Sequence, residues 1–462
     1  FNIKLTRDAE IDIDNDISKS FVEKISKGLK DRKKGQPVRL VYDNTISPDL
    51  LDFIMKKIKF KKDDHPIPGG RYHNFKDFIS FPNIGNPELR YKKIVPLKHP
   101  DLKDQPTLFK IIKKKDVLIT YPYQSFDHLI DLLREASIDP CVKNVKITLY
   151  RVAKNSNIVK ALINALKNGK EVTAVVELQA RFDEESNIYW ANKLQEEGAK
   201  VIYGVPGLKV HSKMFIISRK ENNSLVKYAH IGTGNFNGDT AKIYTDHSLL
   251  TADKRITEEV EKVFAFYADN LKTGSYDHLL VSPFFMRKEL VKLINTEIKN
   301  ALNKKEAYII LKLNNLVDVD MIKKLYEASS KGVKIKMIIR GTCSLVAGVK
   351  GMSDNIEAIS VIDKFLEHSR LFIFCNGGKE KYFLSSADWM TRNLDHRSEV
   401  AVPIYDKAIQ QHLREIMDTL WSDNTKARVL GVKQNNEYRV LKNDIHVRAQ
   451  EKIYNLLKPR KT

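Results

Sequence analysis

Residues 207–218 read GLKVHSKMFIIS, and after a charged gap residues 228–238 read YAHIGTGNFNG. The first segment is rich in Val, Ile, Met and Phe, which predicts a strand. His211 and Lys213 are two residues apart, so on a strand their side chains leave the same face. The small residues 232–235 predict a turn whose backbone N–H groups can approach an anion closely. A neutral imidazole, a cation and exposed amides together suit nucleophilic attack on phosphorus.

A second copy of this pattern favours function, because a single histidine two residues from a cation is usually structural. Residues 365–374 read FLEHSRLFIF, which places His368 and Arg370 in the same relation, and residues 384–393, LSSADWMTRN, follow as a second small-residue turn. Both copies are preceded by a helix, a strand, a helix that ends before a glycine, and another strand. The chain therefore contains an internal duplication with roughly 160 residues per copy.

The duplication predicts an α/β protein with two similar domains that meet at a pseudo-twofold interface, where the two histidines face each other. We place the first domain at residues 106–278 and the second at residues 279–462. Residues 1–105 resemble neither copy and predict a partial α+β head domain, the remainder of a scaffold or dimerisation domain. The chain begins inside a predicted strand without an initiating Met, and we expect that an N-terminal part is absent.

Composition limits the partners. The 462 residues contain 79 Lys and Arg against 58 Asp and Glu, a formal net charge of +21. Such a field attracts nucleic acid, anionic membranes or inorganic phosphate chains without distinguishing among them. Three widely spaced cysteines form no zinc or disulfide pattern, which suits a reducing cytosol. No apolar run approaches the roughly 18 residues of a membrane span, so we expect a cytoplasmic protein, with peripheral contact at the inner face of the membrane left open.

Arginines follow the predicted strands of both copies. Arg151 follows the strand at residues 143–150, and Arg181 follows ELQA after the next strand. Ligands of open α/β sheets bind at this edge, and arginine there can bind phosphate through two nitrogens. The alternative is a surface ion pair, for which the acids at 183–185 offer partners. Arg340 follows a strand of the second copy, close to the position that residues 178–181 hold in the first.

Acidic residues follow each turn and predict a partner for an imidazole. The segment AKIYTDHS contains Asp246, and DHRSEVAVPI in the second copy contains Asp395 and Glu399. A carboxylate can fix the tautomer of a histidine and stabilise its cation. Further basic residues of the second copy are expected to add to a cationic site: Arg287, Arg370, Arg392 and Arg397.

Paired HxK and GxxN motifs on a duplicated α/β domain resemble the phospholipase D superfamily. The second copy departs from that pattern by having Arg370 in place of Lys, and Ser218 and Cys375 stand where an acid is usual. The chain is more similar to the polyphosphate kinases that form a phosphohistidine, and this similarity covers essentially the whole chain. The segments that carry it are ITLYR, ELQARFDEE, GLKVHSKM, HIGTGNFN, IYTDHS, IIRGTC, FLEHSR, SSADWMTRN and LTRDAE.

The resemblance implies reversible transfer of the terminal phosphate of ATP to inorganic polyphosphate, with ATP and ADP as substrates and Mg²⁺ as cofactor. It implies that His211 is the nucleophile that becomes phosphorylated. It implies that Tyr244, Arg340 and His368 contact the nucleotide, and that His368 also exchanges a proton with the leaving group.

The remaining assignments concern phosphate and metal. Lys213, Asn235 and Arg370 are expected to bind phosphate. The resemblance places Arg151 and Arg181 at the Mg²⁺ site. Because a guanidinium has no lone pair, we expect these two arginines to bind phosphate oxygens beside the ion.

Two other functions stay open: a phospholipase D-like phosphodiesterase or nuclease, and a catalytically inactive module that binds polyanions. Cleavage of bis(4-nitrophenyl) phosphate or DNA without phosphoryl exchange would favour the first. Failure to acquire label from γ-labelled ATP would favour the second. We expect no requirement for nucleic acid and a homo-oligomer, either dimer or tetramer. The sequence does not decide the reaction direction, the polyphosphate length, the nucleotide affinity of this chain or the role of residues 424–462.

Overall fold

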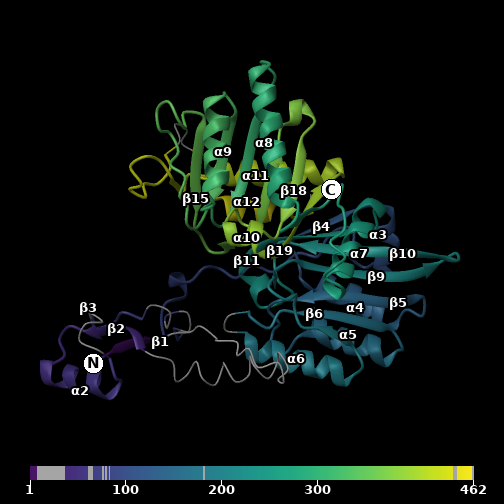
Figure 1. Cartoon of the computed structure of the whole chain (residues 1–462), viewed down its shortest axis with the longest axis horizontal. Helices are drawn as coiled ribbons and strands as arrows, with labels where there is room; N and C mark the ends of the chain where they lie inside the picture. The colour runs from purple at the N-terminus through teal and green to yellow at the C-terminus, as the bar shows by residue number, and fades with distance from the viewer. Residues whose placement is uncertain are drawn as a thin grey trace. The chain divides into compact units, whose positions relative to one another are not determined.

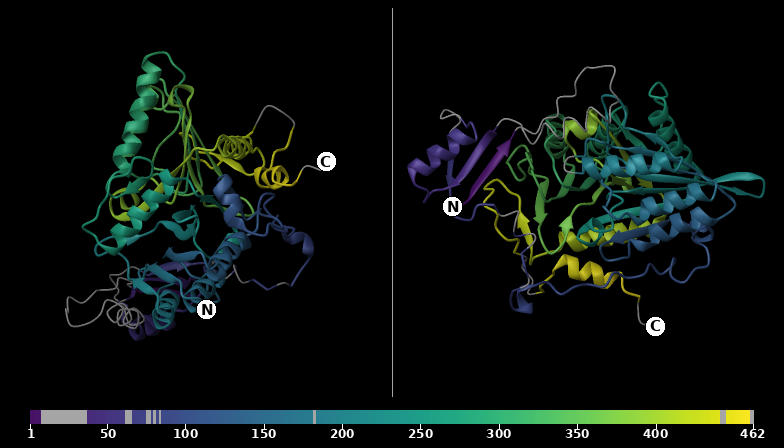
Figure 2. Two further views of the ribbon diagram at one scale, coloured as in Figure 1. Left: turned by 90° about the vertical axis from the view of Figure 1, so that its right-hand side faces the viewer. Right: turned by 90° about the horizontal axis from the view of Figure 1, so that it is seen from below.

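The structure is a computed structural model that describes residues 1–7, 37–60, 66–74, 78, 81–82, 84–180, 183–440 and 445–459. Arg181 lies outside the described residues. The chain forms two compact units, residues 1–92 and residues 93–462, which are drawn as ribbons in Figures 1 and 2. No helix among the described residues is long and apolar enough to cross a membrane.

The first unit contains a three-stranded sheet of order β1-β2-β3, in which β1 is antiparallel and β3 parallel to β2. Helix α2 begins after Ser47 with Pro48 in its first turn. The backbone N–H that proline lacks would have no partner within the helix at this position, so no hydrogen bond is lost. A small core of Leu40, Met55 and Phe60 joins the helix to the sheet. The bounds are β1 (Ile3–Arg7), β2 (Pro37–Asp43), α2 (Pro48–Lys57), β3 (Ile67–Gly69) and the short 3₁₀ turn η3 (Pro87–Leu89).

The second unit consists of two halves. The first half contains α3 (Leu108–Lys114), β4 (Val117–Tyr121), α4 (Asp127–Ile138), β5 (Val142–Leu149), α5 (Asn157–Lys167), β6 (Glu171–Val176), α6 (Glu184–Glu196), β7 (Lys200–Ile202), β8 (Lys209–Val210), β9 (Lys213–Glu221), β10 (Ser224–Gly232), η4 (Thr240–Lys242), β11 (Tyr244–Thr251) and α7 (Lys254–Ala268). The hairpin of β9 and β10 extends beyond the rest of its sheet (Figure 1).

The second half repeats this order without counterparts of α3 and α6, and it adds η5 between two strands and β20 and α12 at its end. Its elements are β12 (Leu280–Ser282), α8 (Met286–Leu302), β13 (Tyr308–Leu313), α9 (Val319–Ser330), β14 (Lys334–Ile339), β15 (Ile356–Val361), β16 (Leu366–Glu367), β17 (Arg370–Phe374), η5 (Asn376–Gly378), β18 (Lys381–Ser385), α10 (Thr391–Asp395), β19 (Arg397–Ile404), α11 (Lys407–Trp421), β20 (Ala427–Val429) and α12 (Ala449–Leu456).

The two sheets match strand by strand. The eight-stranded sheet has the order β16-β11-β10-β9-β5-β6-β7 with β4 on β11, and the nine-stranded sheet has the order β12-β19-β18-β17-β13-β14-β15-β20 with β8 on β19. The register agrees as well, because Lys213 pairs with Gly232 as Arg370 pairs with Ser385. The predicted α/β class with two duplicated domains after a partial head domain is therefore confirmed.

Glycine ends the same helix in both halves, as the sequence predicts. Gly169 follows α5 with a φ of 71°, and Gly332 follows α9 with a φ of 93°. Glycine adopts this left-handed conformation without the steric cost of a Cβ atom. The chain can then turn at once into β6 and β14, the parallel strands beside β5 and β13.

Each half contributes one short strand to the sheet of the other half. Strand β8 pairs in parallel with β19, with Val210 opposite Ser398. Strand β16 pairs in parallel with β11, with Glu367 opposite Thr245. Figure 1 shows β11 and β19 next to each other where the sheets meet. One apolar core continues across this interface, since the same cluster contains β9 and β11 residues and β17 and β19 residues. The predicted pseudo-twofold interface is thus confirmed.

Candidate active site

His211 lies in a break between β8 and β9 rather than within one continuous strand. The backbone N–H groups of His211 and Ser212 both donate to the carbonyl oxygen of Ser398, at 2.9 and 3.0 Å. These two contacts continue the pairing of β8 with β19 in the second half, and the chain joins the sheet of its own half only at Lys213. The sequence predicted an unbroken strand here, and the interaction that breaks it comes from a residue far away in the chain.

The imidazole of His211 is held by a carboxylate of the second half. Its Nδ1 lies 2.8 Å from Oε2 of Glu399, whose side chain is fully buried. Glu399 also accepts hydrogen bonds from Ser386 Oγ and, at 2.6 Å, from Asn393 Nδ2. Three donors converge on this carboxylate, so it is the acceptor and Nδ1–H of His211 is the donor. The lone pair of His211 is then on Nε2, which has no hydrogen-bond partner in the described part of the chain.

His368 is held in the same way by the first half. It lies in the break between β16 and β17, where Ser369 N donates to the carbonyl oxygen of Thr245 at 2.8 Å. Its Nδ1 is 2.9 Å from both carboxylate oxygens of Asp246. Thr233 Oγ1 donates to Asp246 Oδ1 at 2.6 Å. The two histidines are therefore oriented crosswise, each by a carboxylate of the opposite half.

The acids that the sequence singled out divide into two groups. Asp246 and Glu399 contact the imidazoles, whereas Asp395 pairs with Arg287 at 2.6 Å. Arg287 also pairs with the buried Asp318 at 2.7 Å, and its expected contribution to the cationic site stays a prediction. Its guanidinium is occupied by two carboxylates that join α8, α9 and α10 within the second half.

Two hydroxyl groups of the site were not recognised in the sequence. Thr233 donates to Asp246 and Ser386 donates to Glu399. Both occupy the same position of the two small-residue turns, GTGN and SSAD, and this repeated hydroxyl was the available signal. In the first turn a Cβ added at Gly234 would lie 2.4 Å from Asp246 Oδ2, so glycine is required there for the close approach of this carboxylate.

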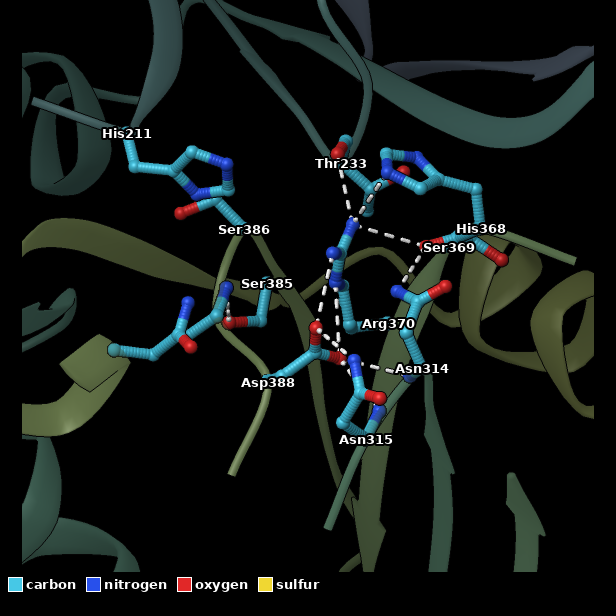
Figure 3. A network of polar contacts seen from close by, with 12 residues as sticks. His211, Thr233, Asn314, Asn315, His368, Ser369, Arg370, Ser385, Ser386 and Asp388 are labelled. Carbon is cyan, nitrogen blue, oxygen red and sulfur yellow. Dashed lines mark hydrogen bonds and ion pairs between the residues drawn. The ribbon is translucent and has the colours of Figure 1, made fainter. Parts of the chain in front are cut away.

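The cations beside the two histidines differ. Lys213 is buried, donates to the carbonyl oxygen of His211 and lies 5.2 Å from the ring centre of Tyr150. Arg370 donates through Nη1 to the carbonyl oxygen of His368 at 3.0 Å and to its Nε2 at 3.2 Å. Its guanidinium also pairs with Asp388 at 3.2 Å. Figure 3 shows the contacts of Arg370 with His368 and Asp388, and it draws His211 and His368 in one close view with Arg370 between them.

Burial sets the protonation of both imidazoles. It lowers the pKa of His211 well below the ordinary 6.5, and the charges of Lys213, Arg397 and Arg370 lower it further. Burial also lowers the pKa of His368, which Asp246 partly opposes. Both rings are therefore neutral near pH 7, with Nδ1–H directed at a carboxylate. This is the form in which Nε2 can act as a nucleophile or an acceptor.

Two residues that the resemblance assigned to the nucleotide lie next to His368. The ring centre of Tyr244 is 5.1 Å from that of His368. Arg340 Nε donates to Asn314 Oδ1, and Asn314 Nδ2 donates to the carbonyl oxygen of His368 at 2.9 Å. By strand register, Arg340 occupies the position of Glu177 in the first half rather than that of residues 178–181.

The remaining predicted residues lie nearer His211 or in the turn. Arg151 pairs with Asp183 at 2.7 Å, and its guanidinium carbon is 5.8 Å from the ring centre of Tyr150. The ring of Tyr150 contacts His211, with ring centres 4.8 Å apart. Asn235 Oδ1 is buried without a hydrogen-bond partner, which leaves its acceptor unsatisfied.

The described residues do not form a metal site of their own. No group of three or more His, Cys, Asp or Glu side chains among them is arranged to hold a metal ion. Arg151 offers donors and no lone pair. A divalent ion at this site would therefore be held mainly by phosphate oxygens and water, and it would arrive with a phosphorylated substrate.

Sequence comparisons find relatives along the whole chain. Profiles of polyphosphate kinase domains match residues 1–81 (middle domain), 107–273 (C-terminal domain 1) and 279–450 (C-terminal domain 2). The polyphosphate kinase of Vibrio parahaemolyticus is 49% identical over 458 residues, which cover 99% of this chain and 66% of that protein. The polyphosphate kinase of Escherichia coli K12 is 49% identical over 460 residues, covering 99% of this chain and 67% of that protein.

A solved structure is similar over most of the chain. The crystal structure of polyphosphate kinase from Porphyromonas gingivalis has a TM-score of 0.84 and 37% sequence identity, and the similarity covers 91% of this chain and 64% of that chain. A duplicated α/β fold that brings together two carboxylate-held histidines among buried cations defines a class of protein with a paired-histidine site suited to chemistry on phosphorus. This chain belongs to the polyphosphate kinase family. It spans about two thirds of the length of the curated relatives it matches.

Proposed function

We propose that this chain contains the active site of a polyphosphate kinase, in which His211 carries a phosphoryl group between ATP and inorganic polyphosphate. The observation that carries the proposal is the state of His211. Glu399 binds its Nδ1 at 2.8 Å, and its Nε2 has no hydrogen-bond partner in the described part of the chain. A neutral imidazole with an open Nε2 beside buried cations is suited to attack an electrophilic phosphorus.

The transfer takes place in two steps. The Nε2 lone pair attacks the γ-phosphorus of ATP, the Nε2–P bond forms, and the P–O bond to the bridging oxygen breaks, so that ADP leaves with that electron pair. A terminal oxygen of polyphosphate then attacks the same phosphorus, and the Nε2–P electron pair returns to His211. The reverse order makes ATP from ADP. Glu399 keeps the Nδ1 proton in place and stabilises the positive charge that the ring gains when it is phosphorylated.

Cations and the turn would bind the phosphate that is transferred. We assign this role to Lys213, Arg370 and Asn235. Arg370 has a buried, preorganised charge, which stabilises the equatorial oxygens of a phosphoryl group more strongly than charge in water does. Burial lowers the pKa of Lys213 well below the ordinary 10.5, so a bound phosphate would hold this amine in its charged form. The unsatisfied Oδ1 of Asn235 is an acceptor, so it suits a protonated phosphate oxygen or a bound water.

The nucleotide would lie on the side of His368. Tyr244 contacts the ring of His368, and Arg340 is joined through Asn314 to the backbone of the same residue. We assign these three functional side chains, Tyr244, Arg340 and His368, to the nucleotide. His368 Nε2, now an acceptor for Arg370, would leave this contact and take a proton from water, with Asp246 stabilising the imidazolium, and would then give that proton to the leaving oxygen.

Further assignments depend on the same resemblance to the polyphosphate kinase family. Mg²⁺ would enter with ATP, and Arg151 and Arg181 would bind phosphate oxygens beside it. The boundaries at residues 106–278 and 279–462, a cytoplasmic location with peripheral contact at the membrane, and a dimeric or tetrameric state stay predictions. The test for assembly is the molar mass in solution from light scattering, which should be two or four times that of one chain.

Incubation of the chain with γ-labelled ATP tests the central proposal. We expect protein-bound label that is labile in acid and stable in base, on the peptide that contains His211. Addition of unlabelled polyphosphate should chase the label into polyphosphate, and addition of ADP should chase it into ATP. Asp395→Asn serves as a matched control, because this carboxylate pairs with Arg287 and not with an imidazole.

Two outcomes would overturn the proposal. Release of nitrophenol from bis(4-nitrophenyl) phosphate, without label on the protein, would indicate a phosphodiesterase. Binding of polyphosphate without label and without hydrolysis would indicate an inactive polyanion-binding module. In both cases the geometry at His211 would serve a reaction or contact other than transfer from ATP.

A further inference from the structure

The C-terminal helix α12 contacts the short strand β16 that precedes His368. Gln450 in the first turn of this helix is buried and lies beside Phe365 and Glu367, which precede His368. No catalytic role was assigned to this part of the chain from its sequence. Its only obvious sequence feature is a basic, mixed composition, so the contact is visible in the folded structure alone.

The side-chain amide of Gln450 binds the backbone of Phe365 as a neighbouring strand would. Phe365 N donates to Gln450 Oε1 at 2.9 Å, and Gln450 Nε2 donates to the carbonyl oxygen of Phe365 at 2.9 Å. The same Nε2 donates to Glu367 Oε1 at 2.7 Å. Strand β16 is at the edge of its sheet, with β11 on one side only, and Gln450 satisfies the polar groups next to its free edge.

Glu367 transmits this contact to His368. Its Oε2 accepts a hydrogen bond from Thr245 Oγ1 at 2.9 Å and pairs with Lys312 Nζ at 3.1 Å, and both charged side chains of this pair are 3% exposed. His368 N donates to the same Thr245 Oγ1 at 3.2 Å. A continuous chain of hydrogen bonds therefore leads from Gln450 through Glu367 and Thr245 to the backbone of His368.

Helix α12 is itself anchored at both ends. Ala449 N donates to Asp423 Oδ2 at 2.7 Å, and the guanidinium of Arg448 makes two hydrogen bonds to Asp363, at 2.6 and 2.8 Å. At the other end, Tyr454 Oη donates to the carbonyl oxygen of Val95 at 2.9 Å. Figure 2 shows this yellow helix beside the blue segment that leads into the first half. The helix thus presents Gln450 from a fixed position.

The first half fixes the strand before its own histidine, His211, without an added helix. Val210 is the counterpart of Glu367, and its backbone N–H donates to Glu177 Oε2 at 2.8 Å. Glu177 follows β6 of the same half. The strand before His211 is therefore held by a side chain of its own half, whereas the strand before His368 depends on an element that only the second half has.

We infer that Gln450 is a positioning residue for His368, which acts through Phe365 and Glu367 to keep the imidazole on Asp246. The geometric part of this inference is independent of the reaction. Its effect on turnover rests on the proposed function.

Nuclear magnetic resonance of the chain with ¹⁵N-labelled histidine tests the geometric part. Each Nδ1–H that donates to a carboxylate should give a downfield proton resonance, assigned with His211→Asn and His368→Asn. Gln450→Met keeps the volume and removes all three hydrogen bonds, so the resonance of His368 should shift or broaden. The resonance of His211, held by Glu399, should stay in place, as should both in the exposed-site control Lys452→Ala. A Gln450→Met spectrum with His368 unchanged, or with both histidines changed equally, would overturn the inference.

Turnover gives the second readout. Gln450→Met should lower kcat of polyphosphate synthesis by about 10- to 100-fold, because a small displacement of a group that helps the leaving oxygen is costly. KM for ATP should change by less than about threefold, and Lys452→Ala should match the parent. Gln450→Glu keeps the acceptor for Phe365 N, loses both donor contacts and brings a second carboxylate next to Glu367, so it should lower kcat at least as much as Gln450→Met. A His368 resonance that moves in a chain without kinase activity would leave the positioning role standing and reject the proposed function.

Discussion

The two halves of the second unit share one scaffold and differ at the atoms that face each other. Lys213 and Arg370 occupy the same register position beside the two histidines. The ammonium of Lys213 reaches the carbonyl oxygen of His211 and leaves Nε2 open, whereas the forked guanidinium of Arg370 reaches both the carbonyl oxygen and Nε2 of His368. Duplication thus supplies two equivalent imidazoles, and a single exchange of Lys for Arg makes one open and the other capped.

The halves also differ in the buried residues of the strands that follow each histidine. His230 and His247 are buried in the first half, and strand register places Phe383 and Val400 at the matching positions of the second. The first half therefore contains titratable groups where the second half has an ordinary apolar core. This difference gives the two halves different responses to acid, although their folds are the same.

Replacement of the two histidines is the most severe test of the difference between them. His211→Asn should abolish protein-bound label and lower polyphosphate synthesis by about 10⁴- to 10⁶-fold, because the nucleophile is lost. His368→Asn should lower synthesis by about 10²- to 10⁴-fold through loss of acid–base assistance, while His211 still acquires label slowly. Quenched-flow measurement of labelling separates the two. Label on His211→Asn protein, or equal losses in both variants, would contradict the assignment.

Replacement of each carboxylate by its amide tests whether each histidine depends on the opposite half. Glu399→Gln should slow labelling of His211 by about 10³- to 10⁴-fold, because an amide no longer fixes the Nδ1–H tautomer. Asp246→Asn should disturb His368 and leave the Nδ1–H resonance of His211 unchanged. Asp395→Asn is the control, because it makes the same change from carboxylate to amide at a residue of the second half that contacts Arg287 and no imidazole. If each carboxylate variant affected the histidine of its own half, the crosswise arrangement would be wrong.

Exchange of the two cations tests the open and capped states directly. Arg370→Lys should free Nε2 of His368 and lower kcat by about 10- to 100-fold, which corresponds to about 1.5–3 kcal/mol for hydrogen bonds to a charged group. The reciprocal Lys213→Arg should cap Nε2 of His211 and slow its labelling by at least the same factor. Single-turnover labelling at saturating ATP measures both. Unchanged labelling in Lys213→Arg would show that an open Nε2 is not what distinguishes His211.

Acid should lower the free energy of unfolding of the first half at a higher pH than that of the second half. Burial lowers the pKa of His230 and of His247 to about 3 from the ordinary 6.5. Between pH 6.5 and 3 the unfolded chain binds protons at these sites and the folded chain does not, so the free energy of unfolding falls as the pH falls through this window. Hydrogen exchange near pH 5 should show faster opening of β9–β11 than of β17–β19. Equal loss of protection in both sheets would reject this source of acid sensitivity.

Much of the fold was accessible from the sequence. The strands around His211 and His368, the helices that end at Gly169 and Gly332, and the duplication all follow from patterns within a few dozen residues, and the structure agrees with them. The break in the strand at His211 could not be predicted, because its cause is the carbonyl oxygen of Ser398 on the other half. Local propensity favours an unbroken strand there, and a tertiary hydrogen bond overrides it.

The sequence by itself determined which chemical groups this protein has and that they occur twice, because composition, periodicity and motif repetition are local properties of a chain. The tertiary structure alone decided which groups meet. His211 finds its carboxylate 188 positions away and His368 finds its own 122 positions away, through two exchanged strands that no local pattern announces. Partners at such separations are selected by packing of the whole unit, since the free energy that orders them comes from the shared core and not from the residues in between.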